Sequence, residues 1–273
     1  MFRNLRRRWR RSVGAFRIRP RVIALQSQLT DVLNEPVELI QSGSRGRDSV
    51  FTVVGVRETP IAMVRLLNPY LRRKPIASDQ PFKTLPGTER INQEFTRYAL
   101  GTQFNLTPQP LWRCEDALLS EYVKGVRLSE EFEQNPSSFW HLNAEVTRVL
   151  GRLHTRGVAH MDASLANTIR GDNGPILIDF EYAAAPHISE IQARVYDHLR
   201  LVESAIKMLS DQSIADSEVW LQALDGELDA DARRCDLTPL RSALLRVFSH
   251  RALGAQLAEL FSQWPSTKNG TEA

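Results

Sequence analysis

The chain has 273 residues, of which 42% are hydrophobic and 25% charged, and these ordinary fractions exclude a disordered or fibrous protein and suit a globular chain with two lobes. The net charge of +3 hides an asymmetry, because residues 1–21 contain nine arginines and no acidic residue, so the remainder carries −6. No apolar run is long enough to cross a bilayer or to serve as a signal peptide, and the two cysteines match no metal-ligand spacing, so we expect a cytoplasmic protein.

Residues 1–20 form a basic segment for which we predict an amphipathic helix that ends at Pro20. Its apolar side chains recur every three or four residues, so they share one stripe, while the arginines lie on the sides and back. The stripe consists of Phe2, Leu5, Trp9, Val13 and Phe16. An anionic membrane surface suits such a helix, whereas nucleic acid would accept the arginines but gives no reason for the stripe. A transit peptide or a merely solvated segment would have a similar composition.

Residues 21–124 are predicted to form a sheet-rich lobe. After a short helix at 21–33, β-branched residues and turn signals alternate, and a polar stretch at 68–87 precedes one further helix capped by Thr88. The predicted strands cover 37–41, 50–56, 61–67, 111–114 and 117–122, and the inserted helix covers about 89–100.

Residues 125–273 are predicted to form a larger helical lobe, joined to the first by a linker near 123–125. Apolar residues recur with the helical period over 138–156, two short strands come next, and the chain is helical over about 189–264. Breaks are expected near 210–213 and 229–239. The sequence therefore predicts an α+β fold with two lobes.

Three polar residues carry the strongest chemical signal. Asp162 and Asn167 lie five residues apart in a predicted loop, and Asp179 comes after an apolar strand twelve residues later. Phosphoryl transfer needs positioned charge more than covalent chemistry: one carboxylate for the hydroxyl that accepts the phosphate, and a second carboxylate with an amide for magnesium. These residue types at this spacing therefore indicate a phosphotransferase.

The same stretch resembles the catalytic loop of the protein-kinase-like superfamily. His160-x-Asp162-x-x-x-x-Asn167 is similar to the kinase loop, and Asp179-Phe180-Glu181 is similar to the Asp-Phe-Gly element. The resemblance implies a bilobal kinase-like fold that uses ATP and Mg²⁺, with Asp162 as the catalytic base and Asn167 and Asp179 as magnesium ligands. It also implies that His160 braces the loop.

Nucleotide-binding positions in the first lobe are implied by the same resemblance. Gly43, Ser44 and Gly46 lie between two predicted strands and would form the phosphate loop, although such a stretch is often only a hairpin turn. The segment from Glu121 to Val123 resembles the hinge that receives adenine through backbone groups.

One position departs from the kinase pattern. Arg65 stands in the third strand where kinases carry a lysine, and the two cations are not interchangeable. Glu94 is the implied ion-pair partner of Arg65, while Lys74 or Lys83 could replace the missing lysine. Asp197 resembles the aspartate that ties the catalytic loop to the helical lobe.

The residues after Asp179 suggest the kind of kinase. They contain no Ala-Pro-Glu element, and Asp-Phe-Glu-Tyr-Ala is similar to the motif of choline and aminoglycoside phosphotransferases, while the compact helical tail resembles bacterial lipopolysaccharide-core sugar kinases. With the basic helix, this favours a kinase on the inner face of a membrane that phosphorylates a lipid-linked sugar. A soluble kinase of a cationic aminoalcohol or aminoglycoside is a rival. Its acidic pocket could use Glu203, Asp211, Asp216 and Glu218, which fit solvated helix faces equally well. The sequence is also compatible with an atypical Ser/Thr protein kinase or with a membrane-associated pseudokinase scaffold.

Overall fold

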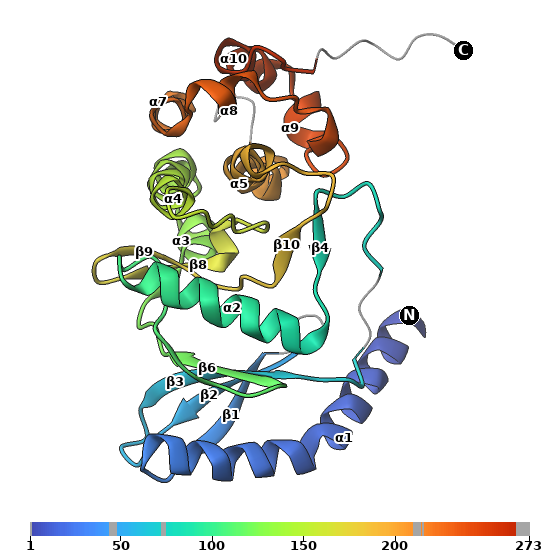
Figure 1. Cartoon of the computed structure of the whole chain (residues 1–273), viewed down its shortest axis with the longest axis vertical. Coiled ribbons are helices and arrows are strands. Elements are labelled where there is room, and N and C mark those ends of the chain that lie inside the picture. Colours follow the sequence, from blue (N-terminus) through green and yellow to red (C-terminus); the bar gives the residue numbers. More distant parts are fainter. Residues whose placement is uncertain (1, 44–47, 72–74, 210–213, 215, 266–273) are drawn as a thin grey trace. The chain divides into compact units, whose positions relative to one another are not determined.

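The computed structural model describes residues 2–43, 48–71, 75–209, 214 and 216–265, and it divides into two compact units (Figure 1). The first, the sheet unit, comprises Met1–Pro75, Pro86–Ala99 and Pro108–Val123. The second, the helical unit, comprises Ile76–Leu85, Leu100–Thr107 and Lys124–Ala273. An antiparallel sheet and a mainly helical part within one chain confirm the predicted α+β class.

The sheet unit contains a five-stranded antiparallel sheet in the order β1-β2-β3-β6-β5. Its elements are α1 (Phe2–Leu33), β1 (Glu38–Gly43), β2 (Asp48–Val54), β3 (Pro60–Leu67), β5 (Pro110–Arg113), β6 (Ala117–Glu121) and most of α2 (Gly87–Thr102). The predicted strands are therefore confirmed to within a few residues. β-branched and apolar residues favour these strands because they pack well on a pleated surface.

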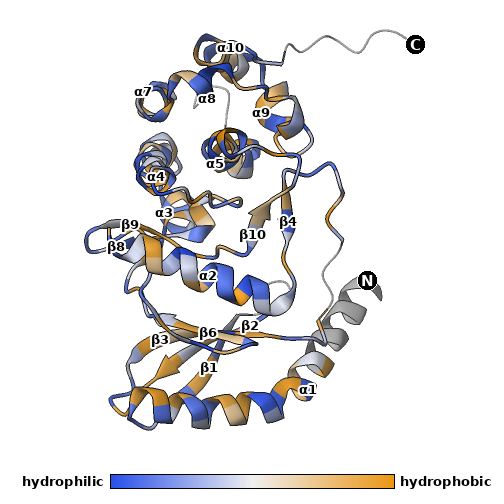
Figure 2. Ribbon diagram, in the orientation of Figure 1, coloured by the Kyte–Doolittle hydropathy of each residue, from blue (hydrophilic) through white to orange (hydrophobic). Residues whose placement is uncertain are grey.

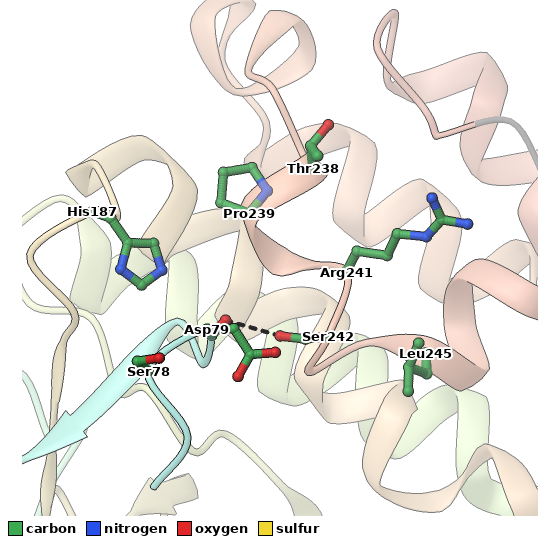
Figure 3. Close-up of a pocket in the computed structure, with 8 residues that line it drawn as sticks. All are labelled: Ser78, Asp79, His187, Thr238, Pro239, Arg241, Ser242 and Leu245. Carbon is green, nitrogen blue, oxygen red and sulfur yellow. Dashed lines mark hydrogen bonds between the residues drawn. The ribbon is translucent and has the colours of Figure 1, made fainter.

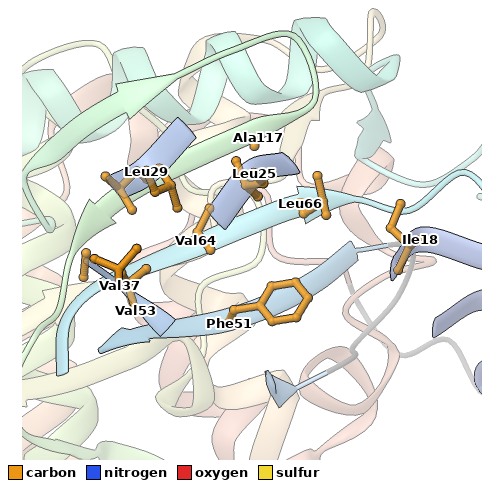
Figure 4. Packing of buried hydrophobic residues seen from close by; sticks show 11 residues of the cluster. Ile18, Leu25, Leu29, Val37, Phe51, Val53, Val64, Leu66 and Ala117 are labelled. Atoms are coloured by element: carbon orange, nitrogen blue, oxygen red, sulfur yellow. The ribbon is translucent and has the colours of Figure 1, made fainter. Parts of the chain in front are cut away.

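The core of the sheet unit lies between one face of the sheet and helix α1. Successive strand residues point to opposite faces, so Ala62, Val64 and Leu66 of β3 are buried on one face. Leu25 and Leu29 of α1 pack into this cluster and are fully buried (Figure 4). Burial of a leucine side chain contributes about 1.5–3 kcal/mol. Helix α1 is thus held on the sheet by its own apolar side.

The prediction that Pro20 ends the first helix is wrong. Helix α1 runs from Phe2 to Leu33 with Pro20 inside it, and polar and apolar residues alternate along its described part (Figure 2). A proline inside a helix removes one hydrogen bond and crowds the preceding turn, at a cost of about 3 kcal/mol. Ile18 before the proline and Leu25 after it are both buried in the same core, and this packing offsets the cost.

The helical unit is built around two long helices, α4 (Phe139–His154) and α5 (Glu190–Ala205). Trp220 packs on Trp140 of α4 with ring centroids 5.6 Å apart, and its ring nitrogen donates to Thr147 at 3.1 Å. The other strands and α-helices described in this unit are β4 (Phe82–Thr84), β7 (Val126–Arg127), α3 (Leu128–Gln134), β8 (Thr168–Gly171), β9 (Gly174–Leu177), β10 (Tyr182–Ala184), α7 (Glu218–Glu227), α8 (Ala230–Arg234), α9 (Leu245–Ser249) and α10 (Arg251–Leu260).

Some of these elements differ from the expectation. Helix α8 lies inside the predicted break at 229–239, while the predicted break at 210–213 lies outside the described residues. The polar stretch 68–87 contains the strand β4, which pairs antiparallel with β10. Three residues are too few to show a strand period, so pairing with a distant partner, and not local sequence, defines β4.

Candidate active site

Asp197 anchors residues 160–167, the loop with the kinase-like motif and here named the catalytic loop after that resemblance, to helix α5. Its carboxylate is fully buried and accepts hydrogen bonds from the backbone N–H groups of His160 (2.6 Å) and Met161 (2.7 Å). The ring of His154, at the end of α4, lies 3.0 Å from the same carboxylate. Helix α5 begins at Ser189 with a capping box, which fixes the register that brings Asp197 to the loop. The tie predicted for Asp197 is therefore confirmed.

His160 braces the loop as predicted. Its Nε2 donates to the carbonyl oxygen of Ile178 at 3.0 Å, and its Nδ1 accepts from the backbone N–H of Asp162 at 3.3 Å. The ring is fully buried against Phe180, at 4.3 Å between centroids. Burial lowers the pKa of the imidazole below its ordinary value, although nearby aspartates raise it. A neutral ring with one donor and one acceptor satisfies both contacts.

Asp162 and Asn167 lie in direct contact. The side-chain amide nitrogen of Asn167 donates to the backbone oxygen of Asp162 at 3.0 Å and to its carboxylate Oδ2 at 3.2 Å. Ser164 caps the short 3₁₀ turn Leu165–Asn167 by accepting from the backbone N–H of Asn167. Because the amide nitrogen faces Asp162, the amide oxygen is the atom left to bind a cation.

The hairpin of β8 and β9 brings Asp179 back to the loop. The pair Thr168 and Leu177 aligns the two strands, and the N–H of Ile178 donates to the carbonyl oxygen of Asn167 at 2.9 Å. Asp179 is therefore the neighbour of a residue that is hydrogen-bonded to Asn167. The φ angles of Met161 and Asp179 are +67° and +71°, in the left-handed region that non-glycine residues rarely occupy. Such strain collects at functional sites, where surrounding contacts hold it.

Arg200 of α5 is a site residue that the sequence motifs did not reveal. Its Nη2 donates to Oδ1 of Asp162 at 3.0 Å, and both side chains are about a quarter exposed, 25% and 27%. Burial raises the pKa of the Asp162 carboxyl above its ordinary value and Asp179 adds to the rise, whereas Arg200 and His160 lower it. A usable signal was present, because Arg200 comes three residues after Asp197 and so shares its helix face.

The sheet unit contains a second charged cluster. Arg65 of β3 lies 3.3 Å from Glu94 of α2 through Nε and 3.4 Å from Asp48 of β2 through Nη1. Arg90 of α2 also binds Asp48, at 2.6 Å. The predicted ion pair between Arg65 and Glu94 is therefore present. Asp48 and Arg90 were not predicted, because nothing in their local sequence marks a contact across 42 residues.

Other predicted nucleotide-binding positions are only partly described. Gly43 ends β1 opposite Val50, while Ser44 and Gly46 lie outside the described residues. The backbone N–H of Glu121 donates to Gln109 at 2.8 Å. Val123 is the last residue of the sheet unit.

Neither lysine that could replace the missing kinase lysine gains support. Lys74 lies outside the described residues, and Lys83 is exposed on β4 of the helical unit.

The expectation that Glu203 lines an acidic pocket is wrong. Its side chain is 6% exposed, pairs with Arg246 at 3.0 Å, and accepts from the N–H of Val247 at 2.9 Å. Glu203 therefore caps the start of α9. Asp216 and Glu218 are exposed, and Asp211 lies outside the described residues.

A pocket of about 580 Å³ lies elsewhere in the helical unit (Figure 3). Two of its lining residues are joined by a hydrogen bond of 2.9 Å from the Ser242 hydroxyl to the backbone oxygen of Asp79. His187, eight residues after Asp179, borders it. Most of the lining residues are polar and their charges are mixed: Ser78, Asp79, His187, Thr238, Pro239, Arg241, Ser242 and Leu245.

Two solved structures show a distant likeness to the chain. No protein-family model and no curated relative matches the chain. Among solved structures it is similar to the Rio2 kinase of Chaetomium thermophilum in complex with ADP/Mg²⁺ and phosphoaspartate, with 13% identity, a TM-score of 0.49, and coverage of 88% of this chain and 76% of that one. It is also similar to the PknI kinase domain of Mycobacterium tuberculosis, with 15% identity, a TM-score of 0.43, and coverage of 77% and 94%.

Likenesses this distant carry no conclusion on substrate or site residues. The described elements agree with the protein-kinase-like fold that the sequence resemblance implies. The sheet unit has the antiparallel sheet with one inserted helix that the resemblance predicts, and the helical unit holds the catalytic-loop motif.

Proposed function

We propose that the protein is an ATP- and Mg²⁺-dependent phosphotransferase that phosphorylates a hydroxyl group. The observation that carries the proposal is the contact between Asp162 and Asn167, in a loop whose backbone is held by Asp197 and hydrogen-bonded to the residue before Asp179. These three polar side chains are therefore held close together within one unit.

Asn167 and Asp179 fit the role of magnesium ligands. Mg²⁺ prefers oxygen ligands, and nucleotide-bound Mg²⁺ uses one or two protein side chains together with phosphate oxygens. The amide of Asn167 is oriented with its oxygen available, and Asp179 supplies a carboxylate. Among the described residues no group of three or more His, Cys, Asp or Glu side chains forms a metal site, and this chemistry does not require one. When bound, the ion neutralises charge on the phosphates.

Asp162 would act on the hydroxyl that receives the phosphate. The hydroxyl oxygen forms a bond to the γ-phosphorus while the bond from this phosphorus to the β-phosphate oxygen breaks, and its electron pair leaves with ADP. The proton of the hydroxyl passes to the Asp162 carboxylate. A carboxyl whose pKa is raised by burial is a better proton acceptor than an ordinary one.

The sheet unit would bind the nucleotide. Arg65 supplies a permanent positive charge for phosphate oxygens, and Glu94 and Asp48 hold its guanidinium from two sides. Gly43, Ser44 and Gly46 as phosphate loop, and the backbone from Glu121 to Val123 as adenine hinge, remain proposals that rest on the kinase resemblance. Arg65 provides the cation that the missing lysine would have supplied, and its ion pair with Glu94 holds that cation in place. This favours an active enzyme over a scaffold.

For the phosphate acceptor we favour a lipid-linked sugar at an anionic membrane. Phe16 and Ile23 of α1 are 74% and 63% exposed, and seven residues, two helical turns, separate them, so they share a face opposite the buried Leu25. Phe16 is also the last member of the apolar stripe predicted from the sequence, in which arginines are interspersed. Phe and Arg in this arrangement suit a lipid headgroup region. No helix of the described residues is long and apolar enough to cross a membrane.

A polycationic acceptor would need several carboxylates that are not already paired. Glu203, the buried residue among the four acidic residues expected to line such a pocket, is paired with Arg246.

The function is tested by incubating the protein with γ-labelled ATP, Mg²⁺ and membrane extracts. Wild type should label a lipid-extractable product and Asp162→Ala should not. Asp172→Ala, an exposed aspartate of the same hairpin region, should label normally. Label in protein would instead favour a protein kinase, and absence of any labelled product would refute the proposed activity.

The membrane is tested separately with vesicles of phosphatidylcholine alone or mixed with phosphatidylserine. We expect co-sedimentation only with the anionic vesicles, and its loss in Phe16→Asp/Ile23→Asp. Ala15→Asp/Ala24→Asp adds the same charge at exposed neighbours of the stripe and should lose less binding. Equal loss in both variants would show that charge alone, and not the apolar face, holds the protein.

A further inference from the structure

The carboxylate of Asp162 is held by two donors from different elements. Oδ2 accepts from the amide nitrogen of Asn167 at 3.2 Å, and Oδ1 accepts from Nη2 of Arg200 at 3.0 Å. Each carboxylate oxygen can accept more than one hydrogen bond, so both contacts leave room for a substrate hydroxyl. The side chain is 27% exposed, so a small group can reach it.

Helix α5 holds both the loop backbone and this side chain. Asp197 and Arg200 are three residues apart and therefore share one face of the helix. Asp197 accepts from the backbone N–H groups of the two residues before Asp162, while Arg200 binds the carboxylate of Asp162 itself. Any rotation of the carboxylate would break the bond to Arg200 without disturbing the backbone bonds, so the two contacts have separate tasks.

Arg200 also contacts the hydroxyl of Tyr196, which limits the freedom of its guanidinium. A guanidinium group held in this way can fix the orientation of a carboxylate better than the flexible ammonium group of a lysine.

We propose that Arg200 is a positioning residue that turns the carboxylate of Asp162 toward the phosphate-accepting hydroxyl. The inference rests on the proposed function and adds a residue that neither the sequence motif nor the kinase resemblance assigned.

The experiment compares Arg200→Ala and Arg200→Lys in steady-state turnover of MgATP, with water and with a membrane extract as acceptor. Misplacement of a catalytic group by about 1 Å can cost about 10²-fold in rate. We expect Arg200→Ala to lower kcat by about this factor with KM for MgATP within about twofold of wild type, and Arg200→Lys or added guanidinium ion to restore part of it. Arg194→Ala is the matched control, because Arg194 lies on the same helix and binds Asp229 at 3.4 Å.

The outcomes separate the two proposals. If Asp162→Ala is inactive but Arg200→Ala matches wild type, Arg200 has no positioning role and the proposed function stands. If Arg200→Ala loses nucleotide binding or thermal stability well beyond Arg194→Ala, its role is structural and the inference is overturned. If wild type turns over no ATP with either acceptor, both proposals fall.

Discussion

Replacing Asp197 by alanine tests how the catalytic loop is held. The carboxylate is fully buried and accepts two backbone N–H groups at 2.6 and 2.7 Å, beside a ring nitrogen of His154 at 3.0 Å. A hydrogen bond to a charged group contributes about 1.5–3 kcal/mol. Removal of one partner from a buried charged network costs about 3–5 kcal/mol, because the other groups are left buried without a partner.

We therefore expect Asp197→Ala to lower the free energy of unfolding by about 3–5 kcal/mol. Urea unfolding followed by circular dichroism measures this directly. The free energy of unfolding of Asp197→Asn should lie between those of wild type and Asp197→Ala. The asparagine carbonyl oxygen can still accept a hydrogen bond, whereas its NH₂ group faces other donors and cannot accept from them. MgATP turnover should be lost in Asp197→Ala even at temperatures where the variant is folded, since Asp162 comes directly after the two anchored residues.

The control is Asp231→Ala, whose carboxylate is 69% exposed and pairs with Arg234. An exposed pair of this kind contributes about 0–1 kcal/mol. If the free energy of unfolding of Asp197→Ala lies within about 1 kcal/mol of the wild-type value, which is the change expected for the control, the buried carboxylate does not anchor the loop and the reasoning is wrong.

Three further predictions concern stability. Leu29→Ala in the core under α1 should cost about 2–5 kcal/mol in urea unfolding, whereas Ile23→Ala on the exposed face of the same helix should cost little, and equal losses would contradict the packing described for α1. Gly125→Ala should lower the melting temperature in differential scanning fluorimetry, because an added Cβ would lie 2.0 Å from a backbone carbonyl oxygen, and an unchanged value would show that the linker moves freely. Burial lowers the pKa of His160 and His198, so below about pH 6.5 the unfolded chain binds protons that the folded chain does not. The free energy of unfolding should therefore decrease as the pH is lowered. His198→Phe should make this decrease smaller between about pH 7.5 and 5, and an unchanged pH dependence would exclude His198 as its source.

The parts of the site that the sequence predicted are those whose spacing is short. Asp162, Asn167 and Asp179 lie within one loop and hairpin, so their order along the chain nearly determines their proximity. The strands of the sheet were predictable for a similar reason, since runs of apolar and β-branched residues bounded by turn signals are local features of the sequence.

The parts that were missed depend on contacts between distant segments. Asp48 and Arg90 meet across 42 residues, and Arg200 reaches Asp162 across 38. The first contact leaves no trace in the local sequence, and the second leaves only the three-residue spacing of Arg200 from Asp197. The continuation of α1 through Pro20 has the same origin, because packing on the sheet overrides a local helix breaker.

The way the chain passes between the two units determines which truncations can fold. Before residue 124 it enters the helical unit twice, at Ile76–Leu85 and at Leu100–Thr107. A fragment that starts at residue 124 would leave β10 without the strand β4 and would remove the fully buried Leu106, whose carbonyl oxygen accepts from the N–H of Leu177 at 2.8 Å. Such a fragment would therefore expose a strand edge and a gap in the core, so a folded helical unit requires residues 76–85 and 100–107 as well.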